Sequence, residues 1–107
     1  LTIQGEGGHG SSPHMANDAI VAGSNFVTIA QTVVSRRLNP FETGVVTIGS
    51  FDGKGQFNVI KDQIEIEGDV RALTDQTRDT IQQELTRIVK GIEETFGVTC
   101  EFELKKD

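Results

Sequence analysis

The sequence predicts an α+β fold, a two-layer sandwich in which two helices cover one face of a four-stranded antiparallel sheet. Four segments alternate apolar and polar residues with a period of two, as strands with one buried face do. Two longer segments follow the helical period instead. The six occur in the order β-α-β-β-α-β, which is the ferredoxin-like order. Because 107 residues supply one core, we expect a single domain over residues 1–107.

The first strand and the first helix come before and after a glycine-rich loop. The strand covers Leu1–Gln4, and the helix runs from about residue 18 to residue 36. About half of the circumference of this helix is apolar, formed by Ala19, Ile20, Ala22, Phe26, Val27, Ile29, Ala30, Val33 and Val34. The opposite face of the helix is polar, and the helix carries no charged residue from Ala19 to Ser35. Depletion of charge is typical of a contact surface.

The second strand, residues 43–51, is expected at an edge of the sheet. Residues 45–48 read Val-Val-Thr-Ile and contain none of the Lys or Pro residues that guard exposed edges. Uncharged polar residues could simply decorate a solvated helix, but the unguarded edge favours contact. We therefore predict a symmetric homodimer through strand 43–51 and helix 18–36, with a continuous sheet across the two-fold axis.

The last three elements predict a sheet that is covered on one side only. The second helix spans about residues 74–96, and Gly97 fits its C-terminal stop. Its buried positions are Ile81, Leu85, Ile88, Val89, Ile92 and Phe96. On the third strand the inward residues are Ile64, Ile66, Val70 and Ala72, and on the fourth they are Val98, Cys100, Phe102 and Leu104. The outward residues, among them Glu65, Glu67, Asp69, Arg71, Glu101 and Glu103, are mostly charged.

Composition excludes several classes of partner. A net charge of −6 repels phosphate backbones, and a chain without Tyr or Trp lacks most of the stacking residues that single-stranded binders use, so we expect no nucleic acid. No stretch approaches the roughly 18 apolar residues of a membrane span, so we expect no membrane partner. Cys100 is the single cysteine and cannot form an internal disulfide, which suits a cytoplasmic location.

The glycine-rich loop, residues 5–14, contains three patterns that we consider and set aside. It matches G-x-G-x-x-G, but a dinucleotide site needs a parallel β-α-β unit and an acidic residue after the second strand, where this chain has Gly-Ser-Phe at 49–51. An acyl-phosphate cradle needs a cation, and the loop has no Arg or Lys. A metal site built from His9, His14 and Asp18 is loosely spaced and lacks a clear ligand set.

Three polar residues remain as candidates for function. His9, between two glycines, can donate a hydrogen bond to an oxygen that gains charge, or it is an ordinary loop histidine. Asn58 follows a glycine-rich turn, which it can cap instead of binding a ligand. Arg71, on the open face of the sheet, can clamp a carboxylate or form a surface ion pair with Asp69 or Glu67.

Taken together, these pieces resemble the dimerisation (lid) domain of the metallopeptidase family that includes aminoacylases, glutamate carboxypeptidases and hippurate hydrolase, in its amidohydrolase branch. The resemblance covers essentially the whole chain. Lys61 departs from the family pattern, which has proline there. The matching pieces are Gly-Gly-His-Gly-Ser-Ser-Pro-His at 7–14, Asp-Ala-Ile at 18–20, Gln-Thr-Val-Val-Ser-Arg-Arg at 31–37, Val-Thr-Ile-Gly at 46–49, Asn-Val-Ile at 58–60 and Ile-Glu-Gly-Asp-Val-Arg at 66–71.

The resemblance implies a role for each candidate. His9 would be the catalytic residue, reaching across the dimer to stabilise an oxyanion, while Asn58 and Arg71 would bind the substrate's carboxylate or adjacent carbonyl. The parent protein would hydrolyse the amide bond of small N-acyl amino acids or peptides. Two divalent ions, zinc or else manganese or cobalt, would lie in a missing catalytic domain of the same chain, and none in this domain. The domain alone would then be inactive; the alternative is a free-standing dimeric ligand-binding module.

Overall fold

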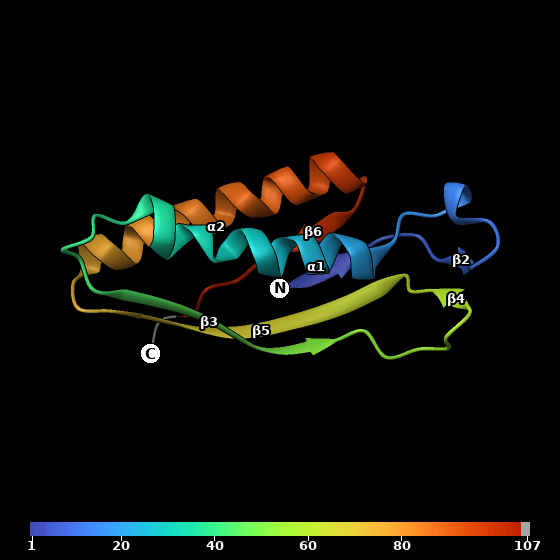
Figure 1. The fold of residues 1–107 in the computed structure, drawn as a ribbon, viewed down its shortest axis with the longest axis horizontal. Helices are drawn as coiled ribbons and strands as arrows, with labels where there is room; N and C mark the ends of the chain where they lie inside the picture. The colour runs from blue at the N-terminus through green and yellow to red at the C-terminus, as the bar shows by residue number, and fades with distance from the viewer. Residues whose placement is uncertain (106–107) are drawn as a thin grey trace.

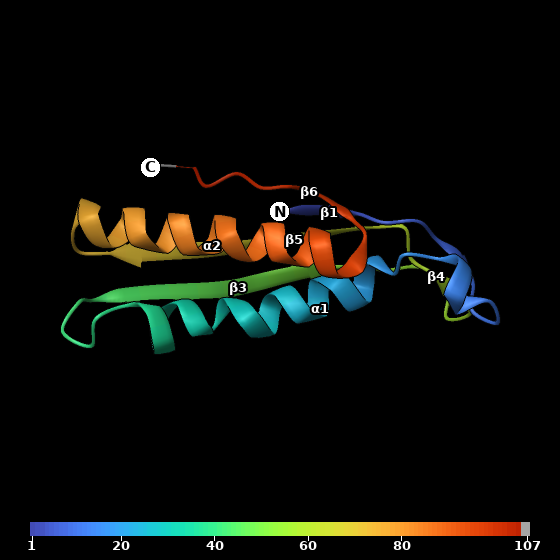
Figure 2. The same ribbon diagram turned by 90° about the horizontal axis from the view of Figure 1, so that it is seen from above.

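The computed structural model describes residues 1–105 and contains the predicted two-layer arrangement, with both helices on one face of the main sheet (Figure 1). The four-stranded sheet has the order β3-β5-β1-β6, and all its pairs are antiparallel. Seen from above, the two helices run side by side along the sheet (Figure 2). The elements of the two layers are β1 (Thr2–Gln4), α1 (Ala19–Ala30), β3 (Gly44–Asp52), β5 (Gln63–Ala72), α2 (Asp75–Phe96) and β6 (Thr99–Glu101).

The predicted order of the main elements and the edge position of the second strand are confirmed. β3 pairs with β5 on one side only, from Gly44 opposite Ala72 to Asp52 opposite Glu65, with a bulge between Ile48 and Ser50. The prediction of a one-sided sheet is also confirmed, because the outward residues of β5 are exposed. β3 therefore presents a long outer edge to solvent among the described residues.

The core lies between the sheet and the two helices. Thr74 caps α2 by accepting a hydrogen bond from the Thr77 backbone N–H, and Gly97 ends the helix in the left-handed conformation at φ 65°. Apolar side chains from both layers fill the space between the sheet and the helices. They are Ile3, Ala19, Ala22, Phe26, Ala30, Val33, Leu38, Ile64, Ile66, Ile81, Leu85, Val89, Ile92 and Val98.

The first helix differs from the prediction of one continuous helix to residue 36. α1 ends at Ala30, and a π-helical segment follows at Val33–Arg37. The Gln31 backbone N–H donates to the carbonyl of Thr28, three residues back, and the Thr32 hydroxyl donates to the carbonyl of Ile29 at 2.6 Å. These bonds replace the regular α-helical pattern, so the helix changes pitch there.

The wide apolar face of the first helix is only partly buried. Ile20, Ile29 and Val34 belong to this face and are 38–40% exposed. Val45 and Phe51 of β3 are exposed as well. α1 lies beside this strand, because a side chain at Gly23 would meet the ring of Phe51. Apolar side chains thus remain uncovered on both elements that the sequence assigns to a dimer contact.

Leucine-to-alanine substitutions should separate core from surface. We expect Leu85→Ala to lower the free energy of unfolding by about 2–5 kcal/mol. Leu85 is only 3% exposed, so its truncation leaves a cavity in the core, while alanine preserves the helical propensity at this position. Leu73→Ala is the matched control, since Leu73 is 81% exposed, and should change stability by less than about 0.5 kcal/mol. Urea denaturation of both variants measures this, and equal losses would contradict the described core.

Candidate functional site

A second, two-stranded sheet holds the glycine-rich loop at one end of the molecule (Figure 1). β2 (Gly8–His9) pairs antiparallel with β4 (Val59–Ile60), and the Gly10 N–H donates to the Asn58 carbonyl at 2.9 Å. The backbones of His9 and Asn58 are therefore neighbours. This ribbon was not predicted, because two-residue strands are too short to show a period of two.

Glycines make the ribbon possible through close backbone approach. A Cβ atom at Gly7 would lie 2.6 Å from the carbonyl oxygen of Ile60, and one at Gly10 would lie 3.0 Å from that of Asn58. Both distances are too short for a side chain to fit without displacement of the opposite strand. The G-x-G-x-x-G pattern thus reflects packing of the loop against the chain around β4.

His9 is exposed, and its ring is oriented by the residue two positions later. The Ser11 backbone N–H donates to His9 Nδ1 at 3.1 Å, and the Ser11 hydroxyl lies 2.7 Å from the same atom. Nδ1 must act as an acceptor for the backbone N–H, so the neutral ring carries its proton on Nε2. Within residues 1–105, no hydrogen bond occupies Nε2. His9 therefore presents one oriented N–H donor to a ligand.

Asp18 and His14 have other surroundings. Asp18 caps α1, because its Oδ1 accepts hydrogen bonds from the N–H groups of Ile20 and Val21. His14 is exposed in a 3₁₀ turn, Pro13–Met15. Over residues 1–105, no group of three or more His, Cys, Asp or Glu side chains is arranged to hold a metal ion.

Arg71 lies near the far end of β5, opposite Val45 of β3. Its Nε donates to Asp69 Oδ2 at 2.7 Å, in an ion pair whose side chains are 76% and 55% exposed. The pairing with Asp69 that the sequence left open is therefore present. Exposed pairs of this kind contribute little to stability. A guanidinium has parallel N–H donors of the kind that bind a carboxylate.

The structure brings His9 and Asn58 together but separates both from Arg71. Eight steps of about 3.3 Å along β5 divide Gln63 from Arg71, which gives about 26 Å. The domain is 48 Å long, with the β2–β4 ribbon at one end and the C-terminal end of β5 at the other. Asn58 and Arg71 of one chain are therefore too far apart to hold the same carboxylate.

Exposed apolar side chains surround the ribbon. Met15 is 74% exposed, Phe57 is fully exposed and Val59 is 48% exposed. The 3₁₀ turn that carries Met15 contacts β2, and Phe57 precedes Asn58 directly. Apolar groups beside oriented polar groups are typical of surfaces that receive a ligand or a second protein surface. Composition alone did not single these residues out, because isolated apolar residues in loops carry no periodic signal.

Cys100 does not belong to this end of the molecule and is a poor nucleophile. Burial, and secondly the nearby carboxylate of Glu93, raise the pKa of the Cys100 thiol to about 11. Its backbone N–H donates to Glu93 Oε2 at 2.8 Å. The thiol is protonated at neutral pH, so the chemistry of a thiolate is not available there.

Comparison with known proteins identifies relatives along nearly the whole chain. Residues 1–95 match the model of the peptidase dimerisation domain. The chain is 40% identical over 106 residues to N-acetyldiaminopimelate deacetylase of Lactococcus lactis subsp. cremoris, and 43% identical to that of Streptococcus pneumoniae. Each match covers 99% of this chain and 28% of the relative, so the chain spans about a quarter of these proteins' length.

Solved structures contain the same fold. A putative aminohydrolase from methicillin-resistant Staphylococcus aureus is 76% identical, with a TM-score of 0.92 over 94% of this chain and 26% of that one. A hydantoinase/carbamoylase family amidase from Burkholderia ambifaria superposes with a TM-score of 0.82 at 19% identity, over 92% of this chain and 24% of that one. The second likeness concerns the fold alone.

Proposed function

Because this chain belongs to the peptidase dimerisation domain family, we propose that its parent protein is a metal-dependent hydrolase of amide bonds whose active site two protomers share. The relatives named as deacetylases and the aminohydrolase structure support this activity. One observation carries the assignment of the site. His9 presents an oriented Nε2–H at one end of the domain, while Arg71 lies at the other end.

The chemistry of amide hydrolysis matches the donor that His9 provides. Attack on an amide carbonyl gives a tetrahedral intermediate whose oxygen carries negative charge. A neutral imidazole with its proton on Nε2 donates a hydrogen bond to this oxygen without itself losing a proton. The bond to Ser11 holds the ring in this tautomer, so the donor is oriented before the charge develops.

Metal ions belong, in this proposal, to the rest of the polypeptide. The described residues offer no ligand set for them. Two divalent ions, zinc or else manganese or cobalt, would polarise the carbonyl and activate the attacking water when bound. The groups of this chain would only bind and orient the substrate, so the isolated domain would not hydrolyse it.

Dimer geometry brings the separated residues together. If the outer edge of β3 pairs with its copy about a two-fold axis, the two strands run antiparallel and the sheet continues across the dimer. The β2–β4 ribbon of each protomer then lies at the same end of the dimer as the C-terminal end of the partner's β5. His9 and Asn58 of one protomer would face the Arg71 end of the other, and the exposed apolar residues of α1 would be buried between the two protomers.

The proposed substrate is a small N-acyl amino acid or peptide. The guanidinium of Arg71 can bind its carboxylate with two parallel hydrogen bonds, and the amide of Asn58 can bind an adjacent carbonyl or carboxylate oxygen. The free thiol of Cys100 is consistent with a cytoplasmic location. None of the helices described in residues 1–105 is long and apolar enough to cross a membrane.

Substrate selectivity tests this function. We expect the full-length protein to hydrolyse N-acetyl amino acids, and the matching carboxamides with kcat/KM about 10- to 100-fold lower, since a hydrogen-bonded charge contributes about 1.5–3 kcal/mol. Arg71→Ala should remove most of this difference, while Arg87→Ala serves as a control on an exposed arginine of α2, outside the proposed dimer contact. Binding of these compounds without any hydrolysis would favour the alternative, a dimeric ligand-binding module.

A further inference from the structure

The segments that carry His9 and Asn58 form an arm at one end of the domain. The arm comprises residues 7–16 and 56–60, and it projects beyond the ends of both helices (Figures 1 and 2). Within residues 1–105, the hydrogen bonds described for the arm join only its own residues. The position of His9 relative to the main sheet therefore depends on the segments that join the arm to the rest of the domain.

These segments meet at a neck, which consists of residues 5–6, 17–19 and 61–62. The Gly5 N–H donates to the Asp62 carbonyl at 2.6 Å and so continues the pairing of β1 with β5 by one bond. Glu6 and Asn17 exchange two backbone hydrogen bonds, of 2.9 Å and 2.8 Å. The neck is therefore an extension of the main sheet.

The neck is also tied to the start of α1. The Ala19 N–H donates to the Lys61 carbonyl at 3.2 Å, and Ala19 itself is fully buried in the core. Asp18 fixes the same segment, because its Oδ1 accepts hydrogen bonds from the N–H groups of Ile20 and Val21. Both layers of the domain thus hold the neck in place.

Gly5 lies against the segment that leads into α1 and leaves no space for a side chain. A Cβ atom at Gly5 would overlap the carbonyl oxygen of Asn17 and would lie 3.4 Å from the Ala19 nitrogen. Both are backbone atoms, so neither can move aside without moving the chain. A larger residue at position 5 would therefore force the neck open and displace the arm.

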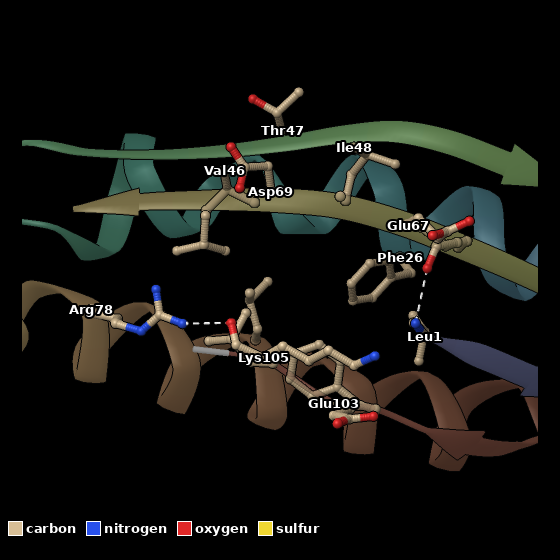
Figure 3. Close-up of a pocket in the computed structure, with 16 residues that line it drawn as sticks. Leu1, Phe26, Val46, Thr47, Ile48, Glu67, Asp69, Arg78, Glu103 and Lys105 are labelled. Carbon is tan, nitrogen blue, oxygen red and sulfur yellow. Dashed lines mark hydrogen bonds between the residues drawn. The ribbon is translucent and has the colours of Figure 1, made fainter. Parts of the chain in front are cut away.

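The two layers are held together away from the neck. Phe26 of α1 is 2% exposed and lies between the layers, and Arg78 of α2 donates from Nη2 to the carbonyl of Lys105 at 2.9 Å (Figure 3). Opening the neck removes neither contact. A substitution at Gly5 should therefore move the arm and leave the two-layer sandwich folded.

We propose that Gly5 is a positioning residue, which keeps the neck closed and thereby places His9 and Asn58 in the shared site. This role rests on the proposed function, in which His9 donates to the oxyanion. The arm moves as one unit, because the pairing of β2 with β4 joins His9 to the segment of Asn58. A misplacement of about 1 Å can lower a rate about 10²-fold, so a small opening of the neck is enough.

Gly5→Ala in the full-length protein tests this role. We expect kcat for an N-acetyl amino acid to fall about 10- to 10²-fold. Exchange of the Glu6 amide should accelerate at least about tenfold, while that of the Gly10 amide inside the arm should change less than about twofold. Gly91→Ala is the matched control and should change none of these, because a Cβ atom at Gly91 meets nothing within 4 Å. Steady-state kinetics and amide exchange followed by mass spectrometry measure them.

A double substitution separates positioning from general damage. Because Gly5 acts through His9, Gly5→Ala should change kcat less than about twofold in a protein that already carries His9→Ala. An equal loss of kcat with and without His9 would overturn the proposal. Unchanged exchange of the Glu6 amide in the Gly5→Ala protein would overturn it as well.

Glu6 provides a second pair of variants at an exposed position of the neck. Glu6→Pro removes the N–H that bonds Asn17 and should lower kcat in the same His9-dependent way, whereas Glu6→Ala keeps this N–H and should not. Equal kcat values for the two would contradict the positioning role. A wild-type protein that hydrolyses no amide would defeat the proposed function alone, since exchange at Glu6 still decides whether Gly5 holds the neck.

Discussion

Replacing His9 by alanine in the full-length protein is expected to lower kcat by about 10²- to 10³-fold, as removal of one oxyanion donor does in other acyl-transfer enzymes. The Nε2–H of the ring is oriented by the Ser11 N–H and has no other role in residues 1–105. Its interaction strengthens as the carbonyl oxygen gains charge, so the loss should appear in kcat more than in KM. Steady-state kinetics with an N-acetyl amino acid measure both.

Two controls distinguish this role from a structural one. His14→Ala removes the other histidine, which is exposed in the adjacent turn, and should leave kcat unchanged. Thermal stability, metal content and dimerisation of the His9 variant should equal those of the wild type, because an exposed side chain contributes less than about 0.5 kcal/mol. A His9→Ala enzyme with undiminished kcat would defeat the oxyanion assignment.

The sequence predicts the main sandwich well because its elements are long enough to show their period. Ten residues of β5 alternate cleanly, and α2 keeps one apolar stripe from Ile81 to Ile92. The first helix was predicted less well, since Thr32 and Ser35 bond to the backbone in ways that composition does not reveal. The β2–β4 ribbon was missed because hydrogen bonds between distant segments, not any local pattern, create it.

The candidate site could be predicted by residue type but not by arrangement. A histidine between glycines and an arginine on an open sheet face are visible in the printed sequence. Their separation is not, because it depends on the direction in which β5 runs from the ribbon to Arg71. The ion pair with Asp69 likewise needed coordinates, since Glu67 was an equal candidate. The roles of His9, Asn58 and Arg71 stay predictions.

Mixing two inactive variants is expected to restore activity if the site is shared. In a dimer of His9→Ala with Arg71→Ala, one site contains both substitutions and the other contains neither, provided that His9 and Arg71 act from different protomers. Random exchange makes half of the dimers mixed, so the mixture should recover about a quarter of the wild-type activity. Each variant alone should stay low, and recovery should follow the rate of subunit exchange.

A third variant determines which residues share a protomer. Asn58 is joined to His9 by the ribbon, through the bond from the Gly10 N–H to the Asn58 carbonyl. In a mixed dimer of His9→Ala with Asn58→Ala, both sites therefore carry one substitution, and no recovery is expected. Recovery with Asn58→Ala but not with Arg71→Ala would reverse the assignment. That result would require His9 and Arg71 of one protomer in the same site, which the roughly 26 Å along β5 does not allow, so it would contradict the described fold as well as the proposed dimer.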